Sequence, residues 1–291
     1  SQIIPIIGLF GAAALRIMPG ISRLITFKQN LDGCYPSINL VHEEIKKNDG
    51  LIEQITIAEA DYDFNEKIIL ENIKYSYPNS KAIFNNLSFE IRKTESICVM
   101  GESGTGKTTL IDLITGLIQP NKGKILCDNK IVNTNNLNWR KKIGYVAQST
   151  FLIDDTIKNN ILFGLSDNEI DNERFNQAVK YAQLDQFIDS LDERENFFVG
   201  ENGIKLSGGQ KQRIGIARAL YYKPDILILD EVTSALDEET SQELLNSLNF
   251  LSGKITLVYI SHNDMVMKNA NTVYELIKTG ENGSLIKKIK K

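Results

Sequence analysis

Short apolar runs separated by polar turns recur from about residue 67 to the end of the chain. Their length and their content of branched and aromatic residues predict β-strands over Ile68–Tyr77, Asn86–Ile91, Ser96–Met100, Gly123–Cys127, Ile143–Ala147, Ile226–Asp230, Ile255–Ile260, Thr272–Leu276 and Ser284–Ile289. Apolar residues at helical spacing predict helices over Thr109–Thr115, parts of 154–191 such as Glu169–Leu184, Gly209–Tyr222, and from Glu238 onward. This order of elements predicts an α/β fold.

The first 45 residues have a different pattern. Residues 1–15 carry no charge, and Arg16, Arg23 and Lys28 then follow among apolar residues at helical spacing. The uncharged run is shorter than the ~20 residues that cross a bilayer, and it lacks the basic start of a signal peptide. We expect over 1–45 the end of a membrane helix that is cut within the membrane, followed by its cytosolic extension. The alternative is an amphipathic helix on a protein core or on a membrane surface.

Residues 46–66 are polar and largely acidic. They are expected to form a linker that includes a short strand at Ile55–Ile57. The globular domain is then expected over 67–291. Because the chain begins at Ser1 rather than Met, we expect it to be a piece of a longer protein.

The composition is that of an ordinary globular protein, with 42% apolar and 24% charged residues. The net charge of −4 gives no reason to expect nucleic acid as a partner. The three cysteines, Cys34, Cys98 and Cys127, are scattered and lack metal-ligand spacing. They are expected to be reduced thiols, mostly buried.

A glycine-rich loop between a predicted strand and a predicted helix is the first candidate site. It fits G-x-x-x-x-G-K-[ST] and consists of Gly101, Glu102, Ser103, Gly104, Thr105, Gly106, Lys107, Thr108 and Thr109. Glycines let backbone N–H groups surround phosphate oxygens, and the following helix start adds partial positive charge. Lys107 is expected to reach the β- and γ-phosphates of a nucleotide, and the Thr108 hydroxyl to bind Mg²⁺.

Two carboxylates end the apolar strand Ile226–Asp230. Because ligands of open α/β sheets bind at the carboxyl ends of the strands, Asp230 and Glu231 are expected beside the phosphates. Asp230 is expected to hold Mg²⁺ through water. Glu231 is expected to orient or deprotonate the attacking water.

The stretch Leu206-Ser207-Gly208-Gly209-Gln210 begins a predicted helix. Ser207 and Gln210 fit a capping box, while two glycines weaken the first helical turn and leave its N–H groups bare for a phosphate. This pentapeptide resembles the signature of ATP-binding cassette (ABC) ATPases. In that family the signature binds the nucleotide held by the phosphate loop of a second subunit, so the resemblance implies a second cassette, expected as a homodimer.

Several single residues also resemble residues of the family's other motifs. The resemblance implies that Tyr77 stacks on adenine, that Gln148 contacts Mg²⁺ and senses the γ-phosphate, and that His262 acts at the γ-phosphate together with Glu231 and Lys107. The stretch 234–237 resembles the loop that crosses between the two nucleotide sites. Asn263 departs from the commoner arginine after the histidine, which leaves the contacts of that position open.

The branch of the family that the chain resembles is the exporters. Val199–Gly203 and Phe151–Ile161 resemble exporter stretches, the second being the region that meets the membrane domain. Phe10–Ile25 also resembles flippases of lipid-linked oligosaccharides and polysaccharide exporters. The resemblance implies a RecA-like parallel-sheet core with an antiparallel β subdomain and an α-helical subdomain. It also implies a transmembrane domain as partner and a place at the cytoplasmic face of the inner membrane.

Two alternatives remain at this point. A soluble ABC ATPase acting on nucleic acid or in translation would call for long coiled coils, two cassettes or a basic face, and the sequence has none of these. A regulatory cassette that does not hydrolyse ATP is disfavoured by the presence of Lys107, Asp230, Glu231 and His262.

Overall fold

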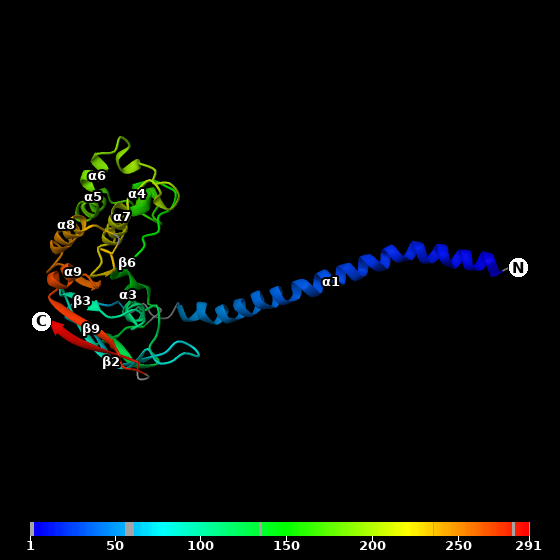
Figure 1. Ribbon diagram of the computed structural model, residues 1–291, viewed down its shortest axis with the longest axis horizontal. Coiled ribbons are helices and arrows are strands. Elements are labelled where there is room, and N and C mark those ends of the chain that lie inside the picture. Colours follow the sequence, from blue (N-terminus) through cyan, green and yellow to red (C-terminus); the bar gives the residue numbers. More distant parts are fainter. Residues whose placement is uncertain (1–2, 56–60, 134–135, 235, 281–282, 291) are drawn as a thin grey trace. The chain divides into compact units, whose positions relative to one another are not determined.

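The computed structural model describes residues 3–55, 61–133, 136–234, 236–280 and 283–290 (Figure 1). Its contacts divide the chain into two compact units, Ser1–Ala58 and Glu59–Lys291. Each unit is described by itself below.

The first unit is one helix, α1 (Ile3–Ile55), which contains Pro19 and Pro36. The helix includes residues 46–55, where we expected a linker, because Lys, Glu, Gln and Leu are good helix formers although most are polar. The expected strand at Ile55–Ile57 is contradicted at Ile55, which ends α1, and residues 56–57 lie outside the described residues. By length and composition, Ile6–Lys46 qualifies as a membrane-spanning helix, the single one among the described residues.

The second unit is built on one mixed sheet of ten strands among the described residues, in the order β5-β4-β1-β2-β10-β9-β3-β8-β7-β6. The strands are β1 (Lys67–Tyr75), β2 (Phe84–Arg92), β3 (Ser96–Met100), β4 (Lys122–Cys127), β5 (Lys130–Ile131), β6 (Ile143–Val146), β7 (Ile226–Asp230), β8 (Thr256–Ile260), β9 (Thr272–Lys278) and β10 (Ser284–Lys290). Strands β9, β3, β8, β7 and β6 pair in parallel, while β1 pairs antiparallel with both β2 and β4. The sheet therefore has a parallel and an antiparallel part.

The parallel strands are buried on both faces, which explains their unbroken apolar sequences. In β7, Ile226 and Ile228 belong to one core cluster, whereas Leu227 and Leu229 belong to the other. The cluster that contains Ile226 and Ile228 includes the apolar residues of α2 (Lys107–Ile114), so this helix covers the same face of the sheet.

The core of this unit begins before Lys67. Tyr62 and Phe64 are buried, and the Tyr62 hydroxyl donates a hydrogen bond of 2.9 Å to the Ile131 carbonyl. The Asp128 carboxylate accepts hydrogen bonds from three consecutive backbone N–H groups, at residues 65–67. These contacts fix the entry into β1, and the polar neighbours of Tyr62 and Phe64 concealed this from the sequence pattern.

Some helices of this unit cover the sheet, and others form a separate helical group at one end of it (Figure 1). The remaining helices and 3₁₀ turns are α3 (Leu137–Lys141), α4 (Ile157–Ile161), η1 (Asp167–Glu169), α5 (Asn172–Tyr181), α6 (Asp185–Asp189), η2 (Arg194–Asn196), η3 (Glu201–Gly203), α7 (Gly208–Tyr221), α8 (Glu238–Asn249) and α9 (Asp264–Asn269). Figure 1 shows α4, α5 and α6 at one end of the unit, and β2 and β9 at the other. The apolar residues of α4, α5 and α6 share a core cluster with those of α7. The short elements β5, α3 and α9 were not predicted, because so few residues carry no periodic pattern.

Candidate nucleotide-binding site

A cavity of about 320 Å³ lies at the carboxyl edge of the parallel strands. Its lining comes from the loop between β3 and α2, from the start of α2, and from the chain just after β6 and β7. The lining residues are Ile83, Ser103, Gly104, Gly106, Lys107, Thr108, Thr109, Gln148, Asp230 and Glu231. All except Ile83 were expected at the site from the sequence. Gly101, Glu102 and Thr105 complete the loop without lining the cavity.

Gly106 shows why this loop requires glycine. Its φ is +100°, in the left-handed region, and a Cβ at this position would lie 2.6 Å from Ile83 Cγ2 and 2.9 Å from the Phe84 ring. The absence of a side chain thus lets the backbone pass close to β2 and turn into α2. Such a turn exposes N–H groups at a helix start, where they can bind an anion.

Lys107, the first residue of α2, is held by its own loop. Its Nζ donates hydrogen bonds to the carbonyl of Gly101 at 2.6 Å and to the carbonyl of Glu102 at 3.0 Å. The Thr105 hydroxyl donates to the same Glu102 carbonyl at 2.9 Å. The ammonium group is therefore already oriented across the loop, facing the cavity that it lines.

The two carboxylates at the end of β7 each accept a hydrogen bond from β6 or from the chain just after it. The Tyr145 hydroxyl donates to Asp230 Oδ2 at 3.0 Å, and Gln148 Nε2 donates to Glu231 Oε2 at 2.8 Å. Glu231 has a left-handed backbone, with φ 48°, and its N–H donates to the Ile260 carbonyl at 2.9 Å. These contacts bring Asp230 and Glu231 to one side of the cavity.

The electrostatics of this corner are set by burial and by neighbouring carboxylates. Burial raises the pKa of Asp230, while the Tyr145 hydrogen bond and the Lys107 charge oppose that shift. Asp112 of α2 also has a raised pKa, because it is partly buried and because Asp230 is near. Negative charge is thus concentrated here, which favours a cation.

The donor atoms fit Mg²⁺ bound largely through phosphate oxygens and water. Among the described residues, no group of three or more His, Cys, Asp or Glu could hold a metal on its own. The Thr108 hydroxyl, the Gln148 amide and the Asp230 carboxylate nevertheless line the same cavity. Mg²⁺ typically takes one or two protein oxygens together with substrate phosphates, and this is the kind of donor set that the cavity offers.

Tyr77 and His262 do not line the cavity. The Tyr77 ring is 40% exposed and packs edge-on against Tyr75, with ring centroids 5.2 Å apart. His262 is exposed and lies two residues beyond Ile260, the residue of β8 that pairs with Asp230. The roles implied for Tyr77 and His262 remain predictions.

The signature stretch lies outside this cavity. Ser207 and Gln210 form the expected capping box, with Gln210 N donating to Ser207 Oγ and Ser207 N donating to Gln210 Oε1. Ser207 and Gly208 are exposed, whereas a Cβ on Gly209 would lie 3.1 Å from Leu236 Cδ2. Of the crossing-loop stretch 234–237, Ala235 is outside the described residues.

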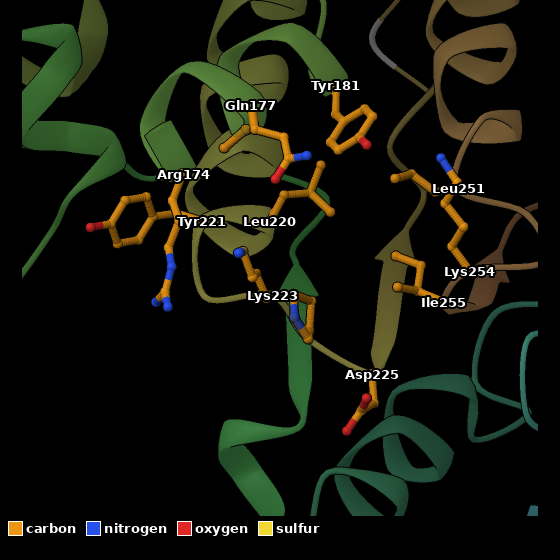
Figure 2. A pocket seen from close by; sticks show the side chains of 12 residues that line it. Arg174, Gln177, Tyr181, Leu220, Tyr221, Lys223, Asp225, Leu251, Lys254 and Ile255 are labelled. Atoms are coloured by element: carbon orange, nitrogen blue, oxygen red, sulfur yellow. The ribbon is translucent and has the colours of Figure 1, made fainter. Parts of the chain in front are cut away.

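A second cavity, of about 250 Å³, lies where β7 begins, and sequence reasoning assigned it no role. Figure 2 shows Gln177 and Tyr181 of α5 on one side of it, and Leu251, Lys254 and Ile255 on another, with Leu220 of α7 between them. Because Asp225 precedes β7 whereas Asp230 ends it, the two cavities are at opposite ends of this strand.

Sequence reasoning also missed three residues of the candidate site: Ile83, Tyr145 and Asp112. Ile83 follows the predicted turn and resembles any apolar strand residue. Tyr145 approaches Asp230 only through the pairing of β6 with β7. Asp112 lies on the helix that follows the phosphate loop, and this place in the sequence was the one signal that could have predicted its role.

Comparison with known proteins identifies the family. A sequence model described as ABC transporter matches residues 84–234. ABC transporter B family member 13 of Arabidopsis thaliana is 38% identical over 72% of this chain and 17% of that protein. The ATP-dependent lipid A-core flippase of Aliivibrio fischeri is 31% identical over 94% of this chain and 47% of that protein. This chain therefore spans less than half the length of either relative.

A solved structure supports the same assignment. The structure of a bacterial Atm1-family ABC exporter with ATP bound matches with a TM-score of 0.69 and 31% identity, over 77% of this chain and 39% of that one. The expected cassette fold is thereby confirmed. Since the family model covers more than half of the 291 residues, this chain belongs to the ABC transporter family.

Proposed function

We propose that this chain is the ATP-binding and ATP-hydrolysing part of an ABC exporter, in which ATP-driven pairing of two cassettes powers transport across a membrane. One observation carries the proposal. A single cavity brings together a glycine-rich loop with its lysine, the Thr108 hydroxyl, and two carboxylates that end a buried strand. These are the groups that phosphoryl transfer to water requires.

Binding of the phosphates is assigned to the loop and the start of α2. Backbone N–H groups there favour anions. Lys107 would exchange its hydrogen bonds to the Gly101 and Glu102 carbonyls for charge-assisted contacts with phosphate oxygens, which are stronger. The loop thus holds the lysine oriented before the nucleotide binds.

Thr108, Gln148 and Asp230 are the residues that would hold Mg²⁺. The ion, when bound, supplies positive charge that offsets the charge of the phosphates. Asp230 suits this role because it is ionisable, partly buried and part of the cavity lining.

Glu231 is the group that would orient the attacking water and accept its proton. Its backbone is fixed by the hydrogen bond to Ile260, and one carboxylate oxygen is fixed by Gln148. A carboxylate fixed in this way retains a second oxygen to accept a hydrogen bond from water.

The signature residues Ser207–Gln210 are proposed to act on the nucleotide of a second cassette. In the part of the chain that the structure describes, these residues do not line the phosphate cavity of their own chain. Ser207 and Gly208 are exposed. The two glycines leave the N–H groups at the start of α7 bare, as an anion requires.

The membrane part of the proposal rests on α1 and on the relatives. Ile6–Lys46 is long and apolar enough to span a bilayer. The match with the lipid A-core flippase covers 94% of this chain, so it extends into this helix. We therefore place the cassette at the cytoplasmic face, attached to a transmembrane domain. The relative named for lipid A and the Arabidopsis transporter both match this chain, so the proposal concerns an ATP-driven step rather than one substrate.

The test is phosphate release from ATP by the whole chain, measured with Mg²⁺ and with the metal removed by EDTA. The proposal expects release that requires Mg²⁺. A Glu231→Gln chain purified identically controls for contaminating ATPases. Tight ATP binding without any hydrolysis above this control would favour the regulatory cassette instead.

A further inference from the structure

Among the described residues, Tyr145 lies outside the expected site but bonds through its side chain to Asp230, a carboxylate that is expected to bind the metal. Its hydroxyl donates a hydrogen bond of 3.0 Å to Asp230 Oδ2, yet Tyr145 does not line the phosphate cavity itself. We propose that Tyr145 is a positioning residue for Mg²⁺: it fixes one oxygen of Asp230 so that the carboxylate presents its remaining acceptor sites to the metal. This inference rests on the proposed function.

The sheet explains how Tyr145 reaches this carboxylate. Strand β6 pairs in parallel with β7, and Tyr145 lies opposite Ile228. Because side chains alternate along a strand, Ile228 and Asp230 point to the same face, and Tyr145 shares it. A phenol is long enough to reach one pleat further along, where its hydroxyl meets Asp230. The contact is thus built into the register of the two strands.

The location of Tyr145 argues against a role in core packing. Strand β6 is the last of the sheet, and Tyr145 remains 45% exposed. Tyr145 lines a different cavity, of about 590 Å³, which residues of α3 and α7 also line. An exposed ring at a sheet edge contributes little apolar burial, so the bond to Asp230 is its most specific contact.

The charges around Asp230 explain why a neutral donor suits this position. Asp230 is surrounded by the carboxylates of Asp112 and Glu231, while the nearby cation, Lys107, is bonded to loop carbonyls. A phenol hydroxyl holds the carboxylate without adding a positive charge, which would compete with Mg²⁺ for the same group. Outer residues that orient metal-binding carboxylates often change metal affinity by 10- to 100-fold.

The experiment compares Tyr145→Phe with the wild-type chain, since this change removes only the hydroxyl. Affinity for a non-hydrolysable ATP analogue is measured with saturating Mg²⁺ and again in EDTA. We expect the affinity in EDTA to stay within about twofold of wild type, because the phosphate loop is untouched. With Mg²⁺ we expect the affinity to fall about tenfold, the lower end of the range for such residues, because the ring is half-exposed.

Tyr222→Phe is the matched control. Tyr222 lines the same cavity as Tyr145, is 49% exposed, and donates its hydroxyl hydrogen to the Phe163 carbonyl at 3.1 Å rather than to a carboxylate. Tyr222→Phe should leave the affinity for the analogue unchanged, both with Mg²⁺ and in EDTA. A merely structural effect of losing a tyrosine hydroxyl would affect both variants and both conditions.

The outcomes separate this inference from the proposed function. If wild type binds the analogue more tightly with Mg²⁺ and Tyr145→Phe does so to the same degree, the role of Tyr145 is overturned while the ATP site stands. An equal loss with and without Mg²⁺ also overturns it, because the effect is then not on the metal. If wild type fails to bind the analogue at all, the proposed function fails first.

Discussion

Gln148 Nε2 donates a hydrogen bond of 2.8 Å to Glu231 Oε2, joining the chain after β6 to the chain after β7. Glu231 is also held through its backbone, with a left-handed φ of 48° and an N–H bonded to Ile260 in β8. Three neighbouring segments of the parallel sheet therefore fix one carboxylate. A group held this firmly suits the orientation of a water molecule.

Glu231→Gln should slow ATP hydrolysis by about 10²- to 10³-fold while ATP binding is kept, since a general base contributes on this scale. The substituted amide oxygen can still accept from Gln148, so the geometry is preserved. Phosphate release and nucleotide titration measure the two properties separately. Glu238→Gln, at the exposed start of α8, is the control. Hydrolysis within threefold of wild type would remove Glu231 from its catalytic role.

Lys107→Ala should weaken ATP affinity, because a charge-assisted contact with phosphate is lost. The phosphate loop also loses the two hydrogen bonds from the lysine to Gly101 and Glu102, which orient it. Equilibrium titration with a fluorescent ATP analogue measures the change. Lys122→Ala, an exposed lysine in β4, should have no effect. Equal affinities for Lys107→Ala and wild type would contradict the assignment of the loop.

Tyr77→Ala should weaken the binding of ATP and GTP alike, by about 1–3 kcal/mol, because stacking on an aromatic ring tolerates any base. Tyr77→Phe retains the ring and should bind both nucleotides nearly as wild type does. Competition titrations with the two nucleotides provide the comparison. If only ATP binding suffers, the base is recognised by hydrogen bonds at some other residue.

The parts of the site that depend on adjacent residues could be predicted from the sequence. The strand, loop and helix around Lys107 form a continuous motif, and the apolar run that ends in Asp230 and Glu231 has the signature of a strand buried on both faces. The capping box at Ser207 is equally local, and it was predicted correctly.

The parts that depend on strand pairing could not be predicted. Tyr145 meets Asp230 because β6 is the neighbour of β7, although 79 residues, 147–225, lie between the two strands in the sequence. The early start of the core, at Tyr62, depends in the same way on Asp128 and β5. The helical state of residues 46–55 was missed because polar composition alone does not separate a linker from a helix.

Asp128→Asn should destabilise the cassette by about 1 kcal/mol at neutral pH, a fall in Tm of about 2–4 °C for a domain of this size. The loss is small because the carboxylate is partly exposed to solvent, which screens its charge. Asn tolerates the φ of 49° at this position, so the change tests the charge and the second acceptor oxygen of the carboxylate rather than the backbone. Differential scanning calorimetry measures the effect.

The loss of stability in Asp128→Asn should depend on pH. Burial raises the pKa of Asp128, but hydrogen bonds from the backbone N–H groups of residues 65–67 outweigh it, so the pKa lies below its ordinary 3.8. A lowered pKa gives stability that is present above the ordinary value and is lost as the pH falls through the folded one. The Tm difference between wild type and Asp128→Asn should therefore shrink below about pH 4. A constant difference down to pH 2 would contradict the role of the carboxylate charge.

The last prediction concerns the need for two chains. Lys107 lines the cavity of its own chain, whereas the exposed Ser207 does not, so an active site is expected to combine Lys107 of one chain with Ser207 of another. Lys107→Ala and Ser207→Arg should each be inactive alone. Co-expressed with different tags and purified through both, the mixed pair has one site with both groups intact and one with both lesions. It should recover up to about half of wild-type hydrolysis, since two symmetric sites become one.

Concentration dependence offers a second, weaker measurement of the same mechanism. If ATP holds the two cassettes together, activity per chain should rise with protein concentration and then level off, as for any reversible association. A dimer that is stable without ATP would give flat activity, so the mixed pair carries the greater weight. The control is a pair of two differently tagged Lys107→Ala chains, which contains no intact site and should stay inactive. A mixed pair no more active than this control would mean that each chain hydrolyses ATP with its own residues.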